Sequence, residues 1–353
     1  MKTTLPNWIL KTWWKYTALL LLAFVLIGGL IVPLGAGLDS VSPAYFEFSK
    51  PTHFSLKGYN THFKSGANTQ LFFRQNGKYL CVDKVLIVSD EELAFETNFN
   101  GKPENNRSFD LIINNDMDGT IALRDAVSFK ADHTSDSSTT TFCEPSVKNN
   151  VEAKFSFPYR EILYESIRNT FYHVPMWFGM LAILLLSLVF SIRYLHTQNL
   201  IYDTIASSAV VVALLAGALG LTTGMMWANY TWGAPWPNDP KLNGAAVGVL
   251  IYVAYIVLRG AIPDTIKKAR ISAVYNVFAI VIYILFIFII PRITDSLHPG
   301  NGGNPAFSKY DLDSHLRLFF YPAVMGWVLL FMWLVTILVR IRFIETKLED
   351  NEN

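Results

Sequence analysis

Six long stretches of this chain contain no Asp, Glu, Lys or Arg, and they limit the folds open to it more than any other feature. A helix that crosses the bilayer core of about 30 Å needs about 20 apolar residues, because each residue advances 1.5 Å. A buried helix of a soluble protein is rarely so long and so free of charge. The pattern therefore predicts six spanning helices. They cover residues 16–37, 174–192, 204–227, 242–258, 271–290 and 318–339.

The composition agrees with a protein that lies in a lipid bilayer. Only 16% of the 353 residues are charged, against about 25% in an ordinary soluble domain. The net charge of +1 gives no electrostatic attraction for nucleic acid or for a polyanionic substrate. We therefore predict an all-α polytopic membrane protein with no nucleic-acid partner, interrupted by one inserted domain.

The distribution of Lys and Arg predicts the orientation, because short cytoplasmic loops are enriched in both residues. With the N-terminus inside, the cytoplasmic segments carry eleven of them and the two short outer loops carry four. The eleven are Lys2, Lys11, Lys15, Arg193, Arg259, Lys267, Lys268, Arg270, Arg340, Arg342 and Lys347, and the four are Lys241, Arg292, Lys309 and Arg317. Both termini are predicted to be cytoplasmic. The first span exceeds the 7–15-residue core of a signal peptide, so we expect an uncleaved anchor.

A polar segment between the first two spans predicts a β-rich domain outside the cytoplasm. It contains short apolar or alternating runs separated by the turn dipeptides Asn-Gly and Asp-Gly. The runs are 70–73, 79–88, 93–97, 108–113 and 120–123, the turns are 76–77, 100–101 and 118–119, and 134–141 is a polar loop. We therefore expect four parts. They are residues 1–38 (N-terminus and first helix), 39–165 (β-rich domain), 166–345 (five-helix membrane domain) and 346–353 (cytoplasmic tail).

Both cysteines, Cys81 and Cys143, fall in this β-rich segment. An oxidising outer compartment permits a disulfide between them. Two unpaired thiols in the core are the alternative, and the sequence leaves both open. A redox-active pair is disfavoured, because the two residues are far apart in sequence and form no CxxC motif.

The common signatures of enzymes are missing from the sequence. It contains no HExxH metalloprotease motif, nucleophile elbow or P-loop. No Asp or Glu lies inside a predicted span, which argues against a pump or ion-coupled transporter that uses intramembrane carboxylates. We therefore expect a protein that is not an enzyme, with its polar chemistry at the outer ends of the helices.

A loop rich in tryptophan and proline is predicted at residues 227–242, after the third span. Its aromatic residues are Trp227, Tyr230, Trp232 and Trp236, and its prolines are Pro235, Pro237 and Pro240. One explanation is an aromatic belt, in which indole rings lie at headgroup depth. The other is a binding surface for a flat apolar ligand, with Asp239 and Lys241 orienting polar groups at its edge. The residues alone leave both open.

Two of the seven histidines, His173 and His298, lie at outer helix ends on either side of this loop. Pro175 suits the first turn of a helix that begins after His173. A lone histidine at an interface is usually a polar cap. Two histidines beside an aromatic surface have the arrangement of axial ligands to haem iron. His315 is also outside and is an alternative second ligand.

Three sequence motifs at these helix ends carry a resemblance to a known family. LTTGMMW…WGAPWPNDPKL, FYHVPMW and SLHPG resemble the haem-handling membrane proteins with the tryptophan-rich WWD signature (the CcmC, CcmF and CcsA types). Within them, the chain is most similar to the six-span haem exporter protein C (CcmC) family of cytochrome c maturation system I. The resemblance covers the membrane part, about residues 1–38 and 160–345.

The resemblance implies a cofactor, its ligands and partners. Haem b is expected at the outer face of the bacterial inner membrane, with residues 39–165 in the periplasm. The implied iron ligands are His173 and His298, and the other implied haem-binding residues are Trp227, Tyr230, Trp232, Trp236 and Asp239. The implied acceptor is a membrane-tethered haem chaperone of the CcmE type. A small single-span subunit (CcmD-type) and ABC transporter subunits (CcmA/CcmB-type) are the further implied partners.

The sequence departs from the family pattern at two points. The signature reads WGxxWxWD, and Asn238 replaces its last tryptophan, so one ring contact to haem is missing. The family has a short loop after the first span, whereas this chain inserts residues 39–165.

Three other functions compete with haem delivery. A system II synthase or haem lyase also carries the WWD signature. A b-type electron-transfer subunit normally has histidines inside its helices, and none lies inside these spans. A membrane receptor or scaffold would act through its periplasmic domain.

Overall fold

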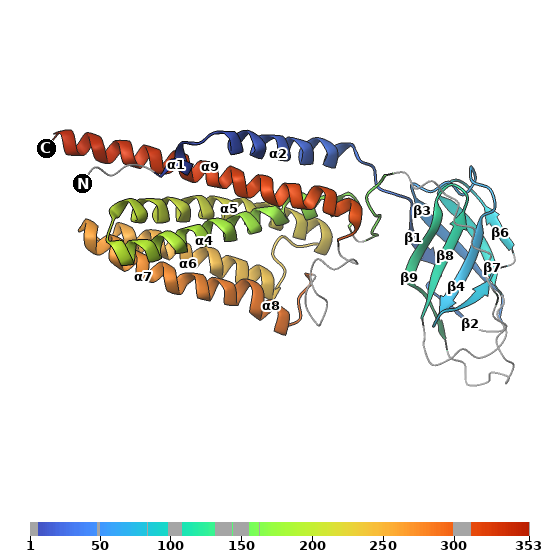
Figure 1. The fold of residues 1–353 in the computed structure, drawn as a ribbon. Coiled ribbons are helices and arrows are strands. Elements are labelled where there is room, and N and C mark those ends of the chain that lie inside the picture. Colours follow the sequence, from blue (N-terminus) through green and yellow to red (C-terminus); the bar gives the residue numbers. More distant parts are fainter. Residues whose placement is uncertain are drawn as a thin grey trace. The chain divides into compact units, whose positions relative to one another are not determined.

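The structure is a computed structural model that describes residues 6–47, 50–82, 84–97, 108–130, 143, 155–161, 163–298 and 312–352. The predicted loop 134–141 and the predicted turn 100–101 lie outside the described residues. The chain divides into two compact units (Figure 1). The membrane unit is Met1–Ile31 with Ser166–Asn353, and the β unit is Val32–Glu165.

The membrane unit contains the six predicted spans, because six described helices are long and apolar enough to cross a membrane. They are α2 (Trp13–Ile31), α4 (Val174–Thr197), α5 (Leu200–Trp232), α6 (Pro240–Gly260), α7 (Thr265–Ile284, extended to Ile293 by a π-helical segment and α8) and α9 (Ser314–Glu352). The shorter elements are α1 (Asn7–Leu10), the 3-10 turn η1 (Tyr164–Arg168), α3 (Asn169–Tyr172), the π-helical η2 (Leu285–Ile289) and α8 (Ile290–Ile293).

The first span is shorter than predicted. The uncharged stretch continues to Gly37, but α2 ends at Ile31 and Gly37 begins a β-strand. Pro33 explains the difference, since the residue before a proline is disfavoured in helical conformation and proline cannot donate a helical hydrogen bond. Within the membrane unit, α2 runs alongside α9 (Figure 1), and Phe24 stacks on Phe319 with ring centroids 5.1 Å apart.

Buried polar groups join the helices at the end opposite the tryptophans. Arg259 of α6 donates two hydrogen bonds to Asp203 of α5, at 2.6 and 2.8 Å. Arg342 of α9 donates to the hydroxyls of Ser207 and Ser208, at 2.9 and 3.1 Å. Unpaired polar groups are costly in a bilayer, so these bonds fix how α5, α6 and α9 pack.

The β unit is built from two sheets that face each other across an aromatic core. The first sheet has the order β1-β3-β7-β6 and the second β2-β9-β8-β4-β5. Phe54, Phe73, Phe95 and Phe109 are buried in this core, and Phe54 stacks on Phe95 at 4.9 Å. The strands are β1 (Gly37–Ser42), β2 (Tyr45–Glu47), β3 (Thr52–Tyr59), β4 (Gln70–Gln75), β5 (Lys78–Cys81), β6 (Lys84–Ile87), β7 (Glu92–Thr97), β8 (Ser108–Asn115) and β9 (Gly119–Lys130).

The predicted strands after residue 70 are present, with one correction. The run 79–88 is not one strand: β5 pairs with β4 in the second sheet, and β6 pairs with β7 in the first. The turn at Asn76 and Gly77 is confirmed, and both residues have the positive φ of a tight hairpin. Strands β1 to β3 were not predicted, because only Phe54 and Leu56 give a short alternating signal there.

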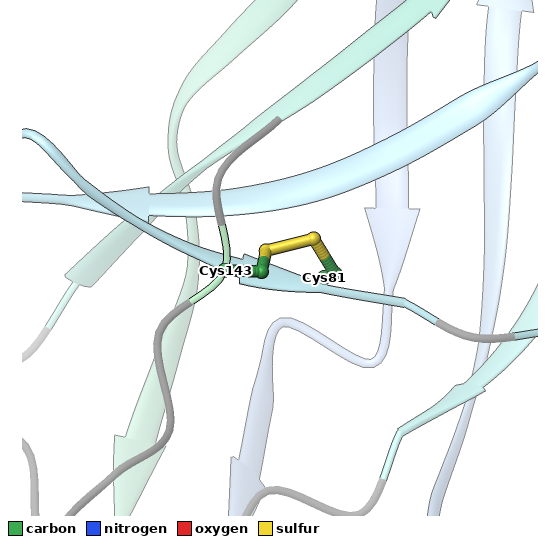
Figure 2. The surroundings of a disulfide bond; sticks show 2 residues. All are labelled: Cys81 and Cys143. Atoms are coloured by element: carbon green, nitrogen blue, oxygen red, sulfur yellow. A yellow bond between two sulfur atoms is a disulfide. The ribbon is translucent and has the colours of Figure 1, made fainter. Parts of the chain in front are cut away.

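The two cysteines form a disulfide, which settles the alternative that the sequence left open (Figure 2). Cys81 ends β5, and Cys143 lies beside it, since the Cys143 amide donates to the Tyr79 carbonyl at 2.9 Å. The bond joins positions 62 residues apart. It therefore ties Cys143 to β5, the edge strand of the second sheet.

Removing this cross-link is expected to destabilise the β unit. Changing Cys81 and Cys143 together to Ser should lower its free energy of unfolding by about 2–4 kcal/mol, because the open chain gains conformational entropy when it unfolds. Denaturant unfolding of the full-length protein in detergent measures this. Reduced wild type should match the double variant. An unchanged transition midpoint in both would show that the bond does not constrain the unfolded chain.

Candidate functional site

His173 lies at the junction of α3 and α4 and is held against the last turns of α5. Its side chain is 9% exposed, and its Nδ1 lies 2.8 Å from Thr223 Oγ1. A Cβ added to Gly224 would come within 2.9 Å of the imidazole Cε1, so the glycine leaves room for the ring. Pro175 occupies the first turn of α4, as predicted.

The hydrogen bonds of Thr223 determine which nitrogen of His173 carries the proton. The Thr223 hydroxyl donates its single hydrogen to the Leu219 carbonyl at 2.8 Å, so it accepts from the His173 Nδ1–H. Nε2 is then the nitrogen with the lone pair. Among the described residues, nothing forms a hydrogen bond with that nitrogen. Nε2 of His173 is therefore the ring nitrogen that is available to a metal.

Asp239 is the N-cap of α6. Its side chain accepts from the backbone amides of Lys241 at 2.9 Å and Leu242 at 3.2 Å. From the loop after α8 it accepts from the Ser296 hydroxyl at 2.8 Å, the Leu297 amide at 2.7 Å and His298 Nδ1 at 3.1 Å. Asp239 is only 1% exposed. It thus fastens the His298 loop to the start of α6.

The charge state of Asp239 follows from these bonds. Burial alone raises the pKa of its carboxyl, but the hydrogen bonds from His298, Leu297 and Ser296 outweigh burial and hold the pKa of Asp239 well below its ordinary value. An ionised carboxylate can only accept, so His298 donates through Nδ1–H. His298 Nε2 is therefore the ring nitrogen that does not bind Asp239, and no described residue forms a hydrogen bond with it.

Two tryptophans surround the His298 ring. Its centroid lies 4.9 Å from that of Trp232 and 6.1 Å from that of Trp227, and the two indoles are 5.0 Å apart. Trp227 also donates its indole N–H to Ser166 at 3.3 Å. These three rings form one cluster, which we call the Trp–His cluster (Trp227, Trp232 and His298).

The predicted loop at residues 227–242 is partly wrong. Trp227, Tyr230 and Trp232 belong to the last turns of α5, which ends only at Gly233, in left-handed conformation. Thr223 and Trp227 are one turn apart and share a helix face. His173, bonded to Thr223, and His298, beside Trp227, therefore approach consecutive turns of the same helix end.

Trp236 lies apart from this cluster, in the true loop between α5 and α6. Its indole N–H donates to Asn243 Oδ1 at 3.1 Å, and the Asn243 amide donates to Asn238 at 3.1 Å. Asn238, which replaces the signature tryptophan, thus supports Trp236 indirectly. Trp236 is 39% exposed, so its ring has a face open to a ligand.

A surface cavity of about 250 Å³ lies on the same face of α5. Its lining residues are Ser166, Asn169, Thr223, Met226, Trp227 and Tyr230. Tyr230 is 63% exposed, and Lys241 is partly buried in the first turn of α6. His315, the alternative ligand, lies in the first turn of α9.

The supporting residues were not found from the sequence. Thr223, Gly224, Ser296 and Asn243 are small or amide residues that occur everywhere, and no local pattern marks them. The TTG in LTTGMMW has significance in the sequence only as part of the family motif. Its physical role appears only when α4 is packed against α5, since Thr223 and His173 are 50 residues apart.

The fold and this site define a class: a multi-pass membrane protein with two oriented histidines among tryptophans at one end of its helices. The chain belongs to the family described as heme exporter protein C (CcmC), whose sequence model matches residues 154–353, more than half of the chain.

Individual relatives agree with this membership. The heme exporter protein C of Paracoccus denitrificans (strain Pd 1222) is 26% identical over 175 residues, which are 50% of this chain and 72% of that protein. The cytochrome c biogenesis protein CcsA of Prochlorococcus marinus (strain MIT 9515) is 40% identical over 68 residues, 19% of this chain and 21% of its own length. The CcsA protein of strain MIT 9303 is 32% identical over 92 residues, 26% of this chain and 28% of that protein. The chain thus matches only a fifth to about a quarter of these CcsA proteins.

Proposed function

We propose that this protein binds haem b at the outer face of the bacterial inner membrane and delivers it for cytochrome c maturation. One observation carries the proposal: His173 and His298 each have Nδ1 fixed by a hydrogen-bond acceptor and Nε2 left for a metal, at one aromatic helix end. Imidazole in this state is a good ligand for haem iron.

The side chains at this end suit haem as cargo. Haem is flat and largely apolar, and the indoles of Trp227 and Trp232 offer apolar ring surface beside His298. The partly exposed rings of Trp236 and Tyr230 extend that surface. We assign iron coordination to His173 and His298, and porphyrin contact to these four aromatic residues.

The role of Asp239 differs from the direct haem contact implied by the family resemblance. All five described hydrogen bonds of its side chain go to the start of α6 and to the His298 loop, and it is buried. Its carboxylate would also repel the anionic propionates of haem. We therefore assign Asp239 as a positioning residue for His298.

The proposed orientation places the site outside the cytoplasm. The excess of Lys and Arg in alternate loops supports cytoplasmic termini. The site is built where α4 begins and α5 ends, and the chain enters α4 from the β unit. Residues 39–165 and the site are therefore both assigned to the periplasmic side.

The proposed activity is binding and hand-off without covalent chemistry. The acceptor is a membrane-tethered haem chaperone of the CcmE type, and CcmD-type and CcmA/CcmB-type subunits are the proposed partners. The local similarity to CcsA proteins favours one second candidate, a cytochrome c haem lyase of system II. That protein would attach haem to apocytochrome without the chaperone.

Complementation tests the proposal. In bacteria that lack their own haem exporter protein C, the wild-type chain should restore haem-stained c-type cytochromes and haem loading of the chaperone. Variants with His173→Ala or His298→Ala should restore neither, at equal membrane abundance. Restoration without the chaperone would favour the lyase. Full activity of both histidine variants would contradict haem handling and favour a receptor or scaffold that acts through the β unit.

A further inference from the structure

The two proposed iron ligands differ in what supports them, and this difference bears on how haem is released. The inference rests on the proposed haem site. His298 donates to a carboxylate, whereas His173 donates to a neutral hydroxyl. The other described ring neighbours of His298 are indoles, and Trp177 meets the His173 ring edge-on at 6.4 Å.

A carboxylate acceptor makes an imidazole a stronger metal ligand than a hydroxyl does. The negative charge stabilises the positive charge that the ring gains on binding a metal, and it raises the basicity of Nε2. The Thr223 hydroxyl carries no charge, and its hydrogen is already committed to the Leu219 carbonyl. An iron bond from His298 would therefore be stronger than one from His173.

The attachment of the two rings adds to this difference. Asp239 binds the His298 loop at three consecutive residues, and the His298 amide donates to the Ser296 hydroxyl at 3.1 Å. The same carboxylate caps α6, so the imidazole of His298 is fixed to a spanning helix through a buried charge. The His173 ring makes a single described hydrogen bond, which its Nδ1–H donates to the Thr223 hydroxyl oxygen.

We propose that His298 is the anchoring ligand and His173 the exchangeable one, so that an acceptor takes haem by displacing His173. In this exchange the bond between iron and His173 Nε2 breaks, and a bond between iron and a donor atom of the acceptor forms. His173 keeps its Nδ1 proton, so no proton or electron is transferred. Asp239 sets the order of release, because it strengthens one ligand and not the other.

Single glycine variants of the full-length protein test the order. After loading with hemin in detergent and gel filtration, His173→Gly should keep most of its haem and show a five-coordinate, high-spin spectrum. Added imidazole should return that spectrum to the six-coordinate, low-spin form. His298→Gly should lose most of its haem in the same procedure. Equal losses, or a greater loss from His173→Gly, would overturn the inference.

Asp239→Asn tests the cause. Asparagine is also a good N-cap, so the change removes the charge and keeps the cap of α6. Loss of haem to apomyoglobin should become about 10–100-fold faster, which is the usual effect of removing a supporting group at a metal site. Thr223→Val should have a smaller effect. The matched control is Asp264→Asn. Asp264 caps α7 by accepting from the Lys267 amide, at the end of the helices away from His298, and this variant should not change the rate of haem loss.

The outcomes separate this inference from the proposed function. If wild type takes up no hemin, the haem site itself is wrong. If wild type binds hemin but Asp239→Asn releases it no faster than Asp264→Asn, the site stands and the proposed order of release is wrong.

Discussion

Changing His173 and His298 together to alanine should abolish haem binding. Both Nε2 atoms are lost, and the indoles of Trp227 and Trp232 remain as apolar contact only. We expect hemin affinity to fall by more than about 100-fold, because removing a supporting group alone costs 10–100-fold at metal sites. Hemin titration of the purified full-length variant, followed by absorbance, measures the loss.

Two single variants serve as controls for this result. His196→Ala changes an exposed histidine in the last turn of α4, at the end away from His173, and should leave hemin binding unchanged. His315→Ala should do the same if His298 is the second ligand. A loss of binding in His315→Ala, with His298→Ala unaffected, would move the second ligand to α9.

Breaking the buried ion pair between Asp203 and Arg259 should cause the largest loss of stability. The two side chains are only 10% and 17% exposed. Asp203→Ala leaves the Arg259 guanidinium without its partner, and breaking such a pair costs about 3–5 kcal/mol. Thermal unfolding of the detergent-solubilised protein should show a clearly lower midpoint.

A double variant and a matched control test that reason. The double variant Asp203→Leu/Arg259→Met should be clearly more stable than Asp203→Ala, because apolar side chains replace buried ion pairs well. Asp264→Ala removes an exposed acid that caps α7, and should cost only about 1 kcal/mol. If Asp203→Ala costs no more than Asp264→Ala, the ion pair does not hold α5 against α6.

The spans could be predicted because a helix that crosses a bilayer needs a long run of residues without charge. The structure has six helices that are long and apolar enough to do so. The end of α5 was not predictable by the same rule. The sequence after Trp227 has the tryptophans and prolines of a loop, yet nothing stops the helix until Gly233 adopts positive φ. Because α5 ends only at Gly233, Trp227, Tyr230 and Trp232 lie on the helix and not in a loop.

The two histidines and the tryptophans could be predicted as site residues from the sequence. Which residue supports which histidine could not be predicted. The resemblance implied that Asp239 contacts haem, whereas its hydrogen bonds with residues 296–298 show that it supports His298. Asp239 and His298 are more than 50 positions apart, and no periodicity in the sequence connects them. Strands β1 to β3 were missed for a related reason, since they are completed by partners such as β7 and β9.

The absorption spectrum of the wild-type protein, purified from cells that make ample haem, tests the central claim most directly. The predicted result is a Soret band with the spectrum of six-coordinate, low-spin haem, because two imidazoles would bind the iron. The pyridine haemochrome of the same sample should be that of haem b. A purified protein without haem that also fails to take up added hemin would contradict the account. Attention would then turn to the β unit and its disulfide-linked edge.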